Sequence, residues 1–464
     1  MSLVNQLITE LVDSITNLDS NDELQINTVN TLMRKLNVNI TSLTSLDESN
    51  NNIHLLLLQI KDLLTSDYDL NYEILFELLS NMVLICSDKL VAETYSEKDI
   101  QAAFDSKITQ LVKISCKVLM KLKGKYLNES IIDSMVARFF DNDTDIAIIS
   151  ELENTFESLS NNLYTPMVDT ILPNLKSQIL SGNVDSILLA RLLDILGIFV
   201  SASKDLKKGG RIHLFLEFDV LKLAKEDVLN LINLIKYTIK VIDLIKNSSP
   251  GREIPLPKVT PSLFAFASIY ANIDDYNDAK YFAKSYLFQL FHKVSQLQGT
   301  EELYRDLDLK YLHINEANKD IVDFLSFTNP IYLLKYHKMV LDSIVELNMR
   351  CFCIIKNLSS SSVSFTYLKK FLSGKKILQM SYLEQILLIQ ILVKYDYSAD
   401  YLLFSLPEVV SDSIISKNTV LRDPEILALK EQVLITLLGH SDTTLKMWKG
   451  PLEKELEVVK RGGS

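Results

Sequence analysis

Apolar residues recur at helical spacing from one end of the chain to the other, in segments of about ten to twenty residues separated by short polar gaps. Clear examples are residues 53–64 (IHLLLLQIKDLL), 108–122 (ITQLVKISCKVLMKL) and 228–245 (VLNLINLIKYTIKVIDLI). The alternation typical of a strand occurs only briefly, at residues 211–220, and that segment fits a short helix equally well. With twelve glycines and ten prolines among 464 residues, few positions interrupt a helix. The sequence therefore predicts an all-α fold.

Several of these helices are apolar on more than one face. A helix in a solenoid contacts its hairpin partner and both neighbouring repeats, so it needs more than one apolar face. Five apolar helices resemble one another loosely, and their anchors lie 46, 67, 34 and 45 residues apart, mostly near the roughly 40–47-residue period of HEAT and armadillo repeats. The anchors are Val241, Leu287, Ile354, Leu388 and Val433. We predict a single, curved HEAT/armadillo-like α-solenoid over residues 1–464.

The segment 382–410 (YLEQILLIQILVKYDYSADYLLFSLPEVV) carries two helix-start patterns. Ser381 precedes Glu384 by three residues and Ser405 precedes Glu408 by three, each a capping-box pattern in which side chains satisfy the first backbone N–H groups of a helix. We therefore expect a helix to begin after each serine. We also expect four apolar side chains of the first helix to be mostly buried between adjacent repeats: Leu383, Ile386, Leu387 and Leu388.

Four of the ten prolines lie at residues 248–262 (SSPGREIPLPKVTPS), a concentration typical of a boundary or a long loop. The helical pattern is alike on both sides of this segment. We therefore predict a loop within one array, which separates N-terminal repeats at residues 1–247 from C-terminal repeats at residues 263–459.

The net charge of −11 argues against a nucleic-acid-binding protein, whose affinity comes mainly from lysines and arginines that neutralise phosphates. The best local basic candidate, residues 204–211 (KDLKKGGR), is interpreted as a solvated loop. The N-terminus lacks the basic region of a signal peptide, and the apolar run at 186–202 contains Arg191 and Asp194 and is short for a membrane span. We expect a cytoplasmic or nuclear protein without membrane contact.

No pattern typical of catalysis or cofactor binding stands out. Residues 141–145 (DNDTD) imitate the start of a calcium-binding loop, but Ile146 stands where glycine and Leu152 where glutamate are needed. An acidic loop that caps the next helix is the better interpretation. Cys351 and Cys353 would face different directions on a helix, so we expect two buried thiols and no metal site. The six histidines are dispersed, and no phosphate-binding or hydrolase motif occurs. We expect neither an enzyme nor a bound cofactor.

Several segments, taken together and in order, are similar to one family. They are residues 29–40 (VNTLMRKLNVNI), 276–296 (YNDAKYFAKSYLFQLFHKVSQ), 329–340 (NPIYLLKYHKMV), 354–359 (IIKNLS), the segment 382–410 and 445–456 (LKMWKGPLEKEL). They resemble the HEAT/armadillo-type assembly chaperone of the proteasome regulatory-particle base in budding yeasts, a relative of the animal non-ATPase subunit five. The resemblance implies a C-shaped solenoid that embraces the C-terminal domain of one AAA-type ATPase subunit. It further implies that the chaperone gathers other base subunits and hinders premature docking onto the core particle.

The same resemblance implies a secondary association with DNA mismatch repair and no catalytic residues. Because the chain is acidic, we expect no direct contact to nucleic acid. A solenoid adaptor or scaffold in transport or in mismatch repair is the alternative function. A transport adaptor would bind basic peptides along a ladder of Asn and Trp, whereas the single tryptophan here, Trp448, lies near the end of the chain.

The second or third helices of solenoid hairpins line the concave face, where polar side chains have no core to enter. On this reasoning we predict a protein-binding surface on these helices. Its residues are Lys236, Lys240, Asn357, Gln390 and Lys394, with the acidic neighbours Asp194 and Asp243. Two interpretations of Asn357 stay open: it lines the groove, as in the third helix of an armadillo repeat, or it caps a helix C-terminus in the left-handed conformation.

Overall fold

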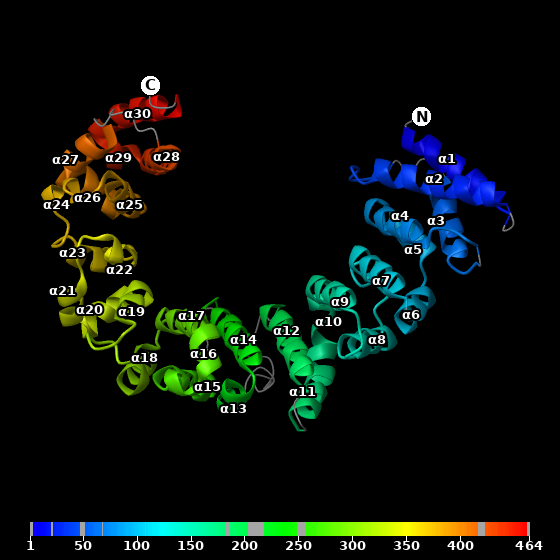
Figure 1. Ribbon diagram of the computed structural model, residues 1–464, viewed down its shortest axis with the longest axis horizontal. Helices are drawn as coiled ribbons and strands as arrows, with labels where there is room; N and C mark the ends of the chain where they lie inside the picture. Colours follow the sequence, from blue (N-terminus) through cyan, green and yellow to red (C-terminus); the bar gives the residue numbers. More distant parts are fainter. Residues whose placement is uncertain are drawn as a thin grey trace. The chain divides into compact units, whose positions relative to one another are not determined.

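The computed structural model describes residues 3–19, 22–46, 52–66, 68–106, 108–181, 185–202, 218–247, 256–415 and 423–461. Within these ranges every regular element is a helix, and no strand occurs (Figure 1). The predicted all-α fold is therefore confirmed, whereas the C-shaped curvature of the whole chain stays a prediction. The ambiguous segment 211–220 and the basic stretch 204–211 fall largely or wholly outside the described residues. None of the described helices combines the length and apolarity needed to cross a bilayer.

The chain forms two compact units, Met1–Glu217 and Phe218–Ser464. The division between them falls before the Pro-rich segment 248–262. Part of that segment is helical, since α15 (Leu256–Ala271) contains Pro257 in its first turn and Pro261 in its second. A proline fits the first turn because the backbone N–H groups there have no acceptor within the helix.

In the first unit the helices form two layers. The first layer contains α1 (Leu3–Thr16), α3 (Asn52–Leu63), α5 (Asp88–Thr94), α6 (Glu97–Asp105), α8 (Glu129–Phe139), α10 (Ser160–Pro166) and α11 (Leu172–Ser181). The second layer contains α2 (Glu23–Ile40), α4 (Tyr72–Ile85), α7 (Thr109–Lys121), α9 (Ile146–Ser158) and α12 (Ser186–Ala202). Each second-layer helix contacts the next, from α2 through α4, α7 and α9 to α12. This succession is the packing expected of a repeat array.

The second unit repeats the arrangement. Its first layer contains α13 (Val220–Glu226), α15, α18 (Glu301–Leu307), α20 (Pro330–Tyr336), α21 (Lys338–Ile344), α23 (Ser362–Leu368), α24 (Gly374–Leu378), α26 (Asp396–Ser405), α27 (Pro407–Val409) and α29 (Asp442–Leu445). Its second layer contains α14 (Val228–Asn247), α17 (Lys284–Ser295), α19 (Ile321–Phe327), α22 (Phe352–Leu358), α25 (Tyr382–Leu392), α28 (Pro424–Leu438) and α30 (Lys449–Lys460), each in contact with the next. The short α16 (Asn277–Phe282) contacts both α14 and α17.

Local signals in the sequence set several helix boundaries. Ser381 and Glu384 form the predicted capping box at the start of α25. The second predicted capping box is wrong, because Ser405 is the last residue of α26 and α27 begins at Pro407 without a side-chain cap. Proline at the first helical position fixes this start instead. Asp145 caps α9 by accepting a hydrogen bond from the Ala147 N–H, as the acidic loop predicted.

The helix α25 shows how the repeats bury their apolar faces. Ile386 and Leu388 are fully buried and Leu387 is partly buried. Leu383 is 38% exposed, so the prediction that it is mostly buried is wrong. Leu383 and Leu387 are four residues apart and share one side of the helix. This side of α25 faces away from the core.

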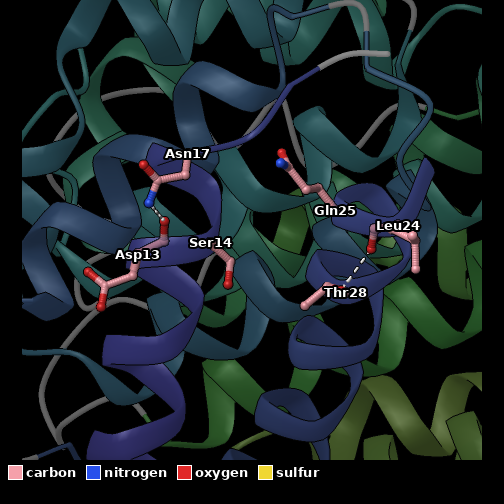
Figure 2. A pocket seen from close by; sticks show the side chains of 6 residues that line it. All are labelled: Asp13, Ser14, Asn17, Leu24, Gln25 and Thr28. Carbon is pink, nitrogen blue, oxygen red and sulfur yellow. Dashed lines mark hydrogen bonds between the residues drawn. The ribbon is translucent and has the colours of Figure 1, made fainter. Parts of the chain in front are cut away.

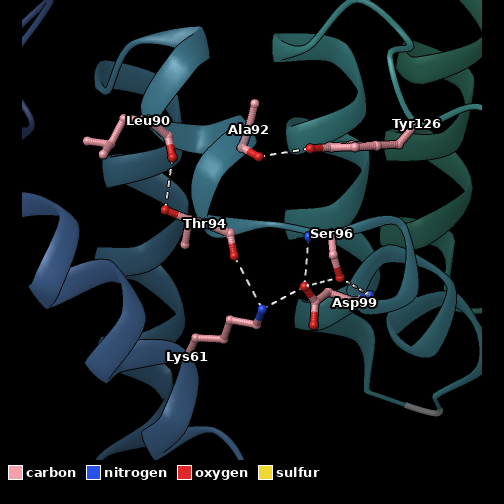
Figure 3. A network of polar contacts seen from close by, with 7 residues as sticks. All are labelled: Lys61, Leu90, Ala92, Thr94, Ser96, Asp99 and Tyr126. Carbon is pink, nitrogen blue, oxygen red and sulfur yellow. Dashed lines mark hydrogen bonds and ion pairs between the residues drawn. The ribbon is translucent and has the colours of Figure 1, made fainter.

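Side chains of one repeat bind backbone carbonyl groups of the neighbouring repeat. In Figure 3, Lys61 Nζ lies 3.2 Å from the Thr94 carbonyl at the end of α5 and 2.6 Å from the Asp99 carboxylate in the first turn of α6. Tyr126 Oη donates to the Ala92 carbonyl at 2.8 Å. Similar donors to carbonyls are Arg138, Arg191, Asn357, Tyr397 and Trp448. These bonds satisfy carbonyl groups at or near helix ends, which the helix itself leaves unpaired.

Candidate protein-binding surface

All seven residues predicted to bind a partner lie in or directly beside the second layers. Asp194 lies on α12 of the first unit. Lys236, Lys240 and Asp243 lie on α14, Asn357 on α22, and Gln390 on α25, with Lys394 two residues beyond the end of α25. The assignment of these polar residues to the second helices of the hairpins is therefore correct. Whether they contact a partner stays a prediction.

On α14 the predicted residues share one side of the helix with the exposed Leu229. Positions 229, 236, 240 and 243 follow the spacing of a single helix face. The Lys236 ammonium lies 5.0 Å from the centre of the Tyr286 ring on α17, and Lys240 is exposed. The Asp243 carboxylate binds Lys293 Nζ of α17 at 2.7 and 2.9 Å. Asp243 thus joins two repeats, whereas the two lysines face solvent.

On α25 the predicted Gln390 and Lys394 lie on the same side as Leu383 and Leu387. Gln390 Nε2 donates to Gln432 Oε1 on α28 at 3.1 Å. Lys394 is exposed, and its ammonium lies 5.6 Å from the centre of the Tyr395 ring. This side of α25 therefore combines an exposed cation with partly exposed leucines, and Gln390 links it to the next repeat.

Asn357 lies inside α22, and neither open interpretation describes it fully. Its Nδ2 donates to the Leu325 carbonyl at 2.9 Å and to the Thr328 carbonyl at 2.7 Å, at the end of α19. The residue is not a left-handed cap of its own helix, because the helix ends one residue later at Leu358 with Ser359 as its cap. Instead, Asn357 caps the neighbouring repeat, so the hydrogen-bonding groups of its amide nitrogen already have partners within the chain.

Asp194 belongs to the first unit and is exposed on α12. Its carboxylate acts on Glu153 of α9: burial and, next, the negative charge of Asp194 raise the pKa of Glu153, while Arg191 lowers it. The second layer of the first unit therefore presents neighbouring acidic groups at this point.

Sequence reasoning missed the exposed apolar residues in the second layer of the second unit and on α16, which contacts that layer. Leu229 on α14 is 71% exposed, Phe282 at the end of α16 is 59% exposed, and Ile435 on α28 is 51% exposed. The run YFAKSYLF at 281–288 gave a signal, since its aromatic residues are too closely spaced to face one side of a helix. We call the exposed side of α14, α16, α17, α25 and α28 the second-layer face. Exposed apolar side chains beside exposed lysines are the composition expected of a protein-binding surface, in which a few apolar anchors are surrounded by a polar rim.

The described residues contain no group of three or more His, Cys, Asp or Glu side chains placed to hold a metal ion. Cys351 is buried as predicted, but Cys353 is exposed, because residues two apart on a helix point in nearly opposite directions. A pocket of about 370 Å³ lies between α1 and α2 (Figure 2). Two of its polar side chains, Asn17 and Thr28, bind carbonyls of their own helices, so the pocket does not present a convergent set of ligand-binding groups.

Comparisons with known proteins cover nearly the whole chain. Residues 5–243 match the family described as DNA mismatch repair protein HSM3, N terminal domain, and residues 252–464 match its C terminal domain. The protein of this name from Eremothecium gossypii is 31% identical over 456 residues, which cover 96% of this chain and 94% of the relative. The Saccharomyces cerevisiae protein is 29% identical over 475 residues, covering 99% and 95%. The resemblance that the six sequence segments indicate is thereby confirmed at the level of the family.

Proposed function

The chain belongs to the HSM3 family, and from this premise we propose that it is an assembly chaperone for the base of the 26S proteasome regulatory particle. In this proposal the second-layer face of the second unit binds the C-terminal domain of an AAA-type ATPase subunit. The bound chaperone would gather further base subunits and hinder premature docking onto the core particle. The proposed role requires no reaction chemistry and no cofactor, and it is exercised in the cytoplasm or nucleus.

The observation that carries this proposal is the composition of the second-layer face. Leu229, Phe282, Leu383 and Ile435 expose apolar groups on four helices, and Lys236 and Lys394 place cations beside them. A folded domain is large enough to contact several helices at once, whereas a short peptide would cover one or two. Since the apolar anchors are distributed over α14, α16, α25 and α28, we expect binding energy to be spread, with the largest losses at the best buried anchors.

The direct test is capture of a purified ATPase C-terminal domain by this chain. We compare wild type with the double variant Lys236→Glu, Lys394→Glu, which reverses two exposed charges of the second-layer face. The control is Lys98→Glu, Lys225→Glu, because both of these lysines are exposed on first-layer helices and the change in net charge is identical. Thermal melting of all three proteins reports whether each variant is folded.

We expect wild type and control to capture the domain, and the second-layer variant to lose most of its capture while it melts like wild type. Equal capture by both double variants would remove α14 and the end of α25 from the interface. Failure of wild type to capture any of the base ATPase C-terminal domains would reject the chaperone proposal.

A scaffold role in DNA mismatch repair is the second candidate function. It is favoured by the name of the relatives, DNA mismatch repair protein HSM3. Cells that lack this chain would then show a raised mutation rate. The variant Lys236→Glu, Lys394→Glu separates the two candidates. If it restores a normal mutation rate although it no longer captures the ATPase domain, repair does not depend on the chaperone interface.

A further inference from the structure

One segment of the second unit has a charge opposite to that of the rest of the chain. Residues 329–383 contain eight lysines and arginines and two acidic residues, a formal charge of +6 within a chain of −11. The remaining residues therefore carry −17. Between Glu346 and Glu384 no acidic residue occurs. So strong a local reversal produces a positive potential that attracts acidic groups.

Five of these lysines lie on α21, directly after α23 and on α24, and these helices follow one another in the first layer of the second unit (Figure 1). All five are exposed. We call them the basic surface: Lys338, Lys369, Lys370, Lys375 and Lys376. The surface belongs to the first layer, so it is separate from the second-layer face.

Asp342 on α21 binds side chains at the end of α23. Its carboxylate accepts a hydrogen bond from Tyr367 Oη at 2.6 Å and forms an ion pair with Lys370. Hydrogen bonds from Lys370 and Tyr367, and the nearby ammonium of Lys338, lower the pKa of Asp342. Asp342 therefore neutralises part of the charge of Lys370 and is also influenced by Lys338.

The other lysines of the basic surface make no ion pair among the described residues. Lys369 lies over the rings of Phe365 and Tyr401, at 5.5 and 5.0 Å from their centres. Lys375 and Lys376 occupy the first turn of α24, at most about 22 Å along the chain from Lys370. Among the described residues, no carboxylate lies within ion-pair distance of Lys338, Lys369, Lys375 or Lys376.

One carboxylate lies beside the α24 end of this surface. Glu408 of α27 packs so closely against Gly374 that a Cβ atom there would collide with its carboxylate. A ligand that extended past Gly374 toward α27 would therefore meet a negative charge. Met339, which is exposed next to Lys338, adds an apolar contact at the other end.

We propose that the basic surface binds an acidic polypeptide segment of a partner protein. A short segment can place its carboxylates over the unpaired lysines and an apolar side chain on Met339. A nucleic acid fits less well, because its phosphates continue at close intervals beyond the five lysines. Those further phosphates would meet the predominantly acidic remainder of the chain, within the roughly 8–10 Å over which charges act in physiological salt.

The test is fluorescence anisotropy with the full chain and a fluorescein-labelled polyglutamate peptide, at physiological ionic strength. The variant Lys375→Glu, Lys376→Glu reverses two charges that make no ion pair, so its fold should be unaffected. Lys370 is left unchanged because its loss would free Asp342. The control is again Lys98→Glu, Lys225→Glu, with the same change in net charge. Labelled oligothymidylate serves as the nucleic-acid probe.

We expect polyglutamate to bind wild type and control alike, and the affinity of the Lys375→Glu, Lys376→Glu variant to fall about tenfold, since two exposed charge attractions are lost and become repulsions. Equal losses in both double variants would show general charge attraction and overturn the proposal. Tighter binding of oligothymidylate than of polyglutamate would assign the surface to nucleic acid instead. Absence of polyglutamate binding, with self-association that only the Lys375→Glu, Lys376→Glu variant abolishes, would make it an interface between copies of this chain.

Discussion

Lys430 and Glu455 form an ion pair inside the packing of α28 against α30, the last two helices of the second layer. The two side chains are 2% and 6% exposed, and Lys430 Nζ lies 2.5 Å from Glu455 Oε1. We consider the variant Lys430→Met, which keeps the length and apolar stem of the side chain and removes the charge. Glu455 is then left buried without its partner.

The expected cost follows from this burial. Breaking a buried pair by removing one partner typically destabilises by about 3–5 kcal/mol, because the remaining charge has lost its water and its counter-ion. Replacing both members by apolar residues of similar volume is often neutral or stabilising by about 1–4 kcal/mol. We therefore expect Lys430→Met to be strongly destabilising and Lys430→Met, Glu455→Met to be close to wild type.

In a repeat array each helix is held mainly by its neighbours, so the loss should be local. Hydrogen exchange of the α30 amides is the appropriate measurement. A cost of about 3–5 kcal/mol lowers protection by roughly a hundredfold to several thousandfold, up to complete detachment of α30. Amides of α14 and α17 in the same sample serve as the internal control, and their exchange should not change.

The reasoning would be refuted by a Lys430→Met protein whose α30 exchanges within about fivefold of wild type, a change of about 1 kcal/mol. It would also fail if the double variant were as unprotected as the single variant. That result would mean that the attraction between Lys430 and Glu455, and not the cost of a buried Glu455 without its partner, accounts for the loss.

Three further predictions concern single side chains. Leu388→Ala should cost about 2–5 kcal/mol in urea unfolding because Leu388 is fully buried, whereas Leu383→Ala should cost less than about 1 kcal/mol; equal losses would contradict the assigned faces of α25. Asn357→Ala leaves two carbonyls of α19 without a donor and should cost about 1–3 kcal/mol, measured by thermal melting together with ATPase-domain capture; weaker capture without any loss of stability would make Asn357 a direct contact. Burial raises the pKa of Asp99, but hydrogen bonds from Lys61 and Ser96 outweigh burial and hold this pKa below its usual range. Asp99 therefore stabilises the fold above about pH 4, and this stabilisation is lost as the pH falls through the pKa of Asp99 in the folded protein. The urea midpoint of Asp99→Asn should therefore be lower than that of wild type at pH 7, and the two midpoints should converge in acid. A difference between the midpoints that stays constant from pH 7 into acid would count against the ion pair.

Much of the fold could be predicted because the spacing of apolar residues along the chain is periodic. Apolar spacing along α14 and α25 identifies helices, and their second apolar faces indicate repeats on both sides. Helix boundaries were predictable where one side chain acts locally, as at Ser381. The prediction was wrong at Ser405, where the following proline sets the start of the helix. Burial was predictable for Ile386 and Leu388 but not for Leu383, since an entirely apolar helix does not reveal which of its sides stays open.

The candidate surface was predictable only as far as its helices. Lys236 and Lys394 are exposed on the second layers, as polar residues of those helices should be. Asp243, Gln390 and Asn357 bind neighbouring repeats, and nothing in their spacing distinguishes them from residues that face solvent. Their partners lie 50, 42 and about 30 residues away, and such long-range pairs become visible only once the helices are packed.

The links between repeats have a consequence for how such a sequence can change over time. Lys61, Tyr126, Asn357 and Trp448 each donate to a backbone carbonyl of a neighbouring repeat, and every residue type supplies that acceptor. A substitution at Thr94, Ala92 or Leu403 therefore leaves the link intact, provided that the helix path is kept. Only the residue whose side chain donates the hydrogen bond must keep its chemical type. Donors as different as lysine, tyrosine and tryptophan all bind a backbone carbonyl. An array joined in this way tolerates extensive neutral drift while the links between its repeats persist, which is consistent with the 23–31% of residues that this chain shares with its relatives.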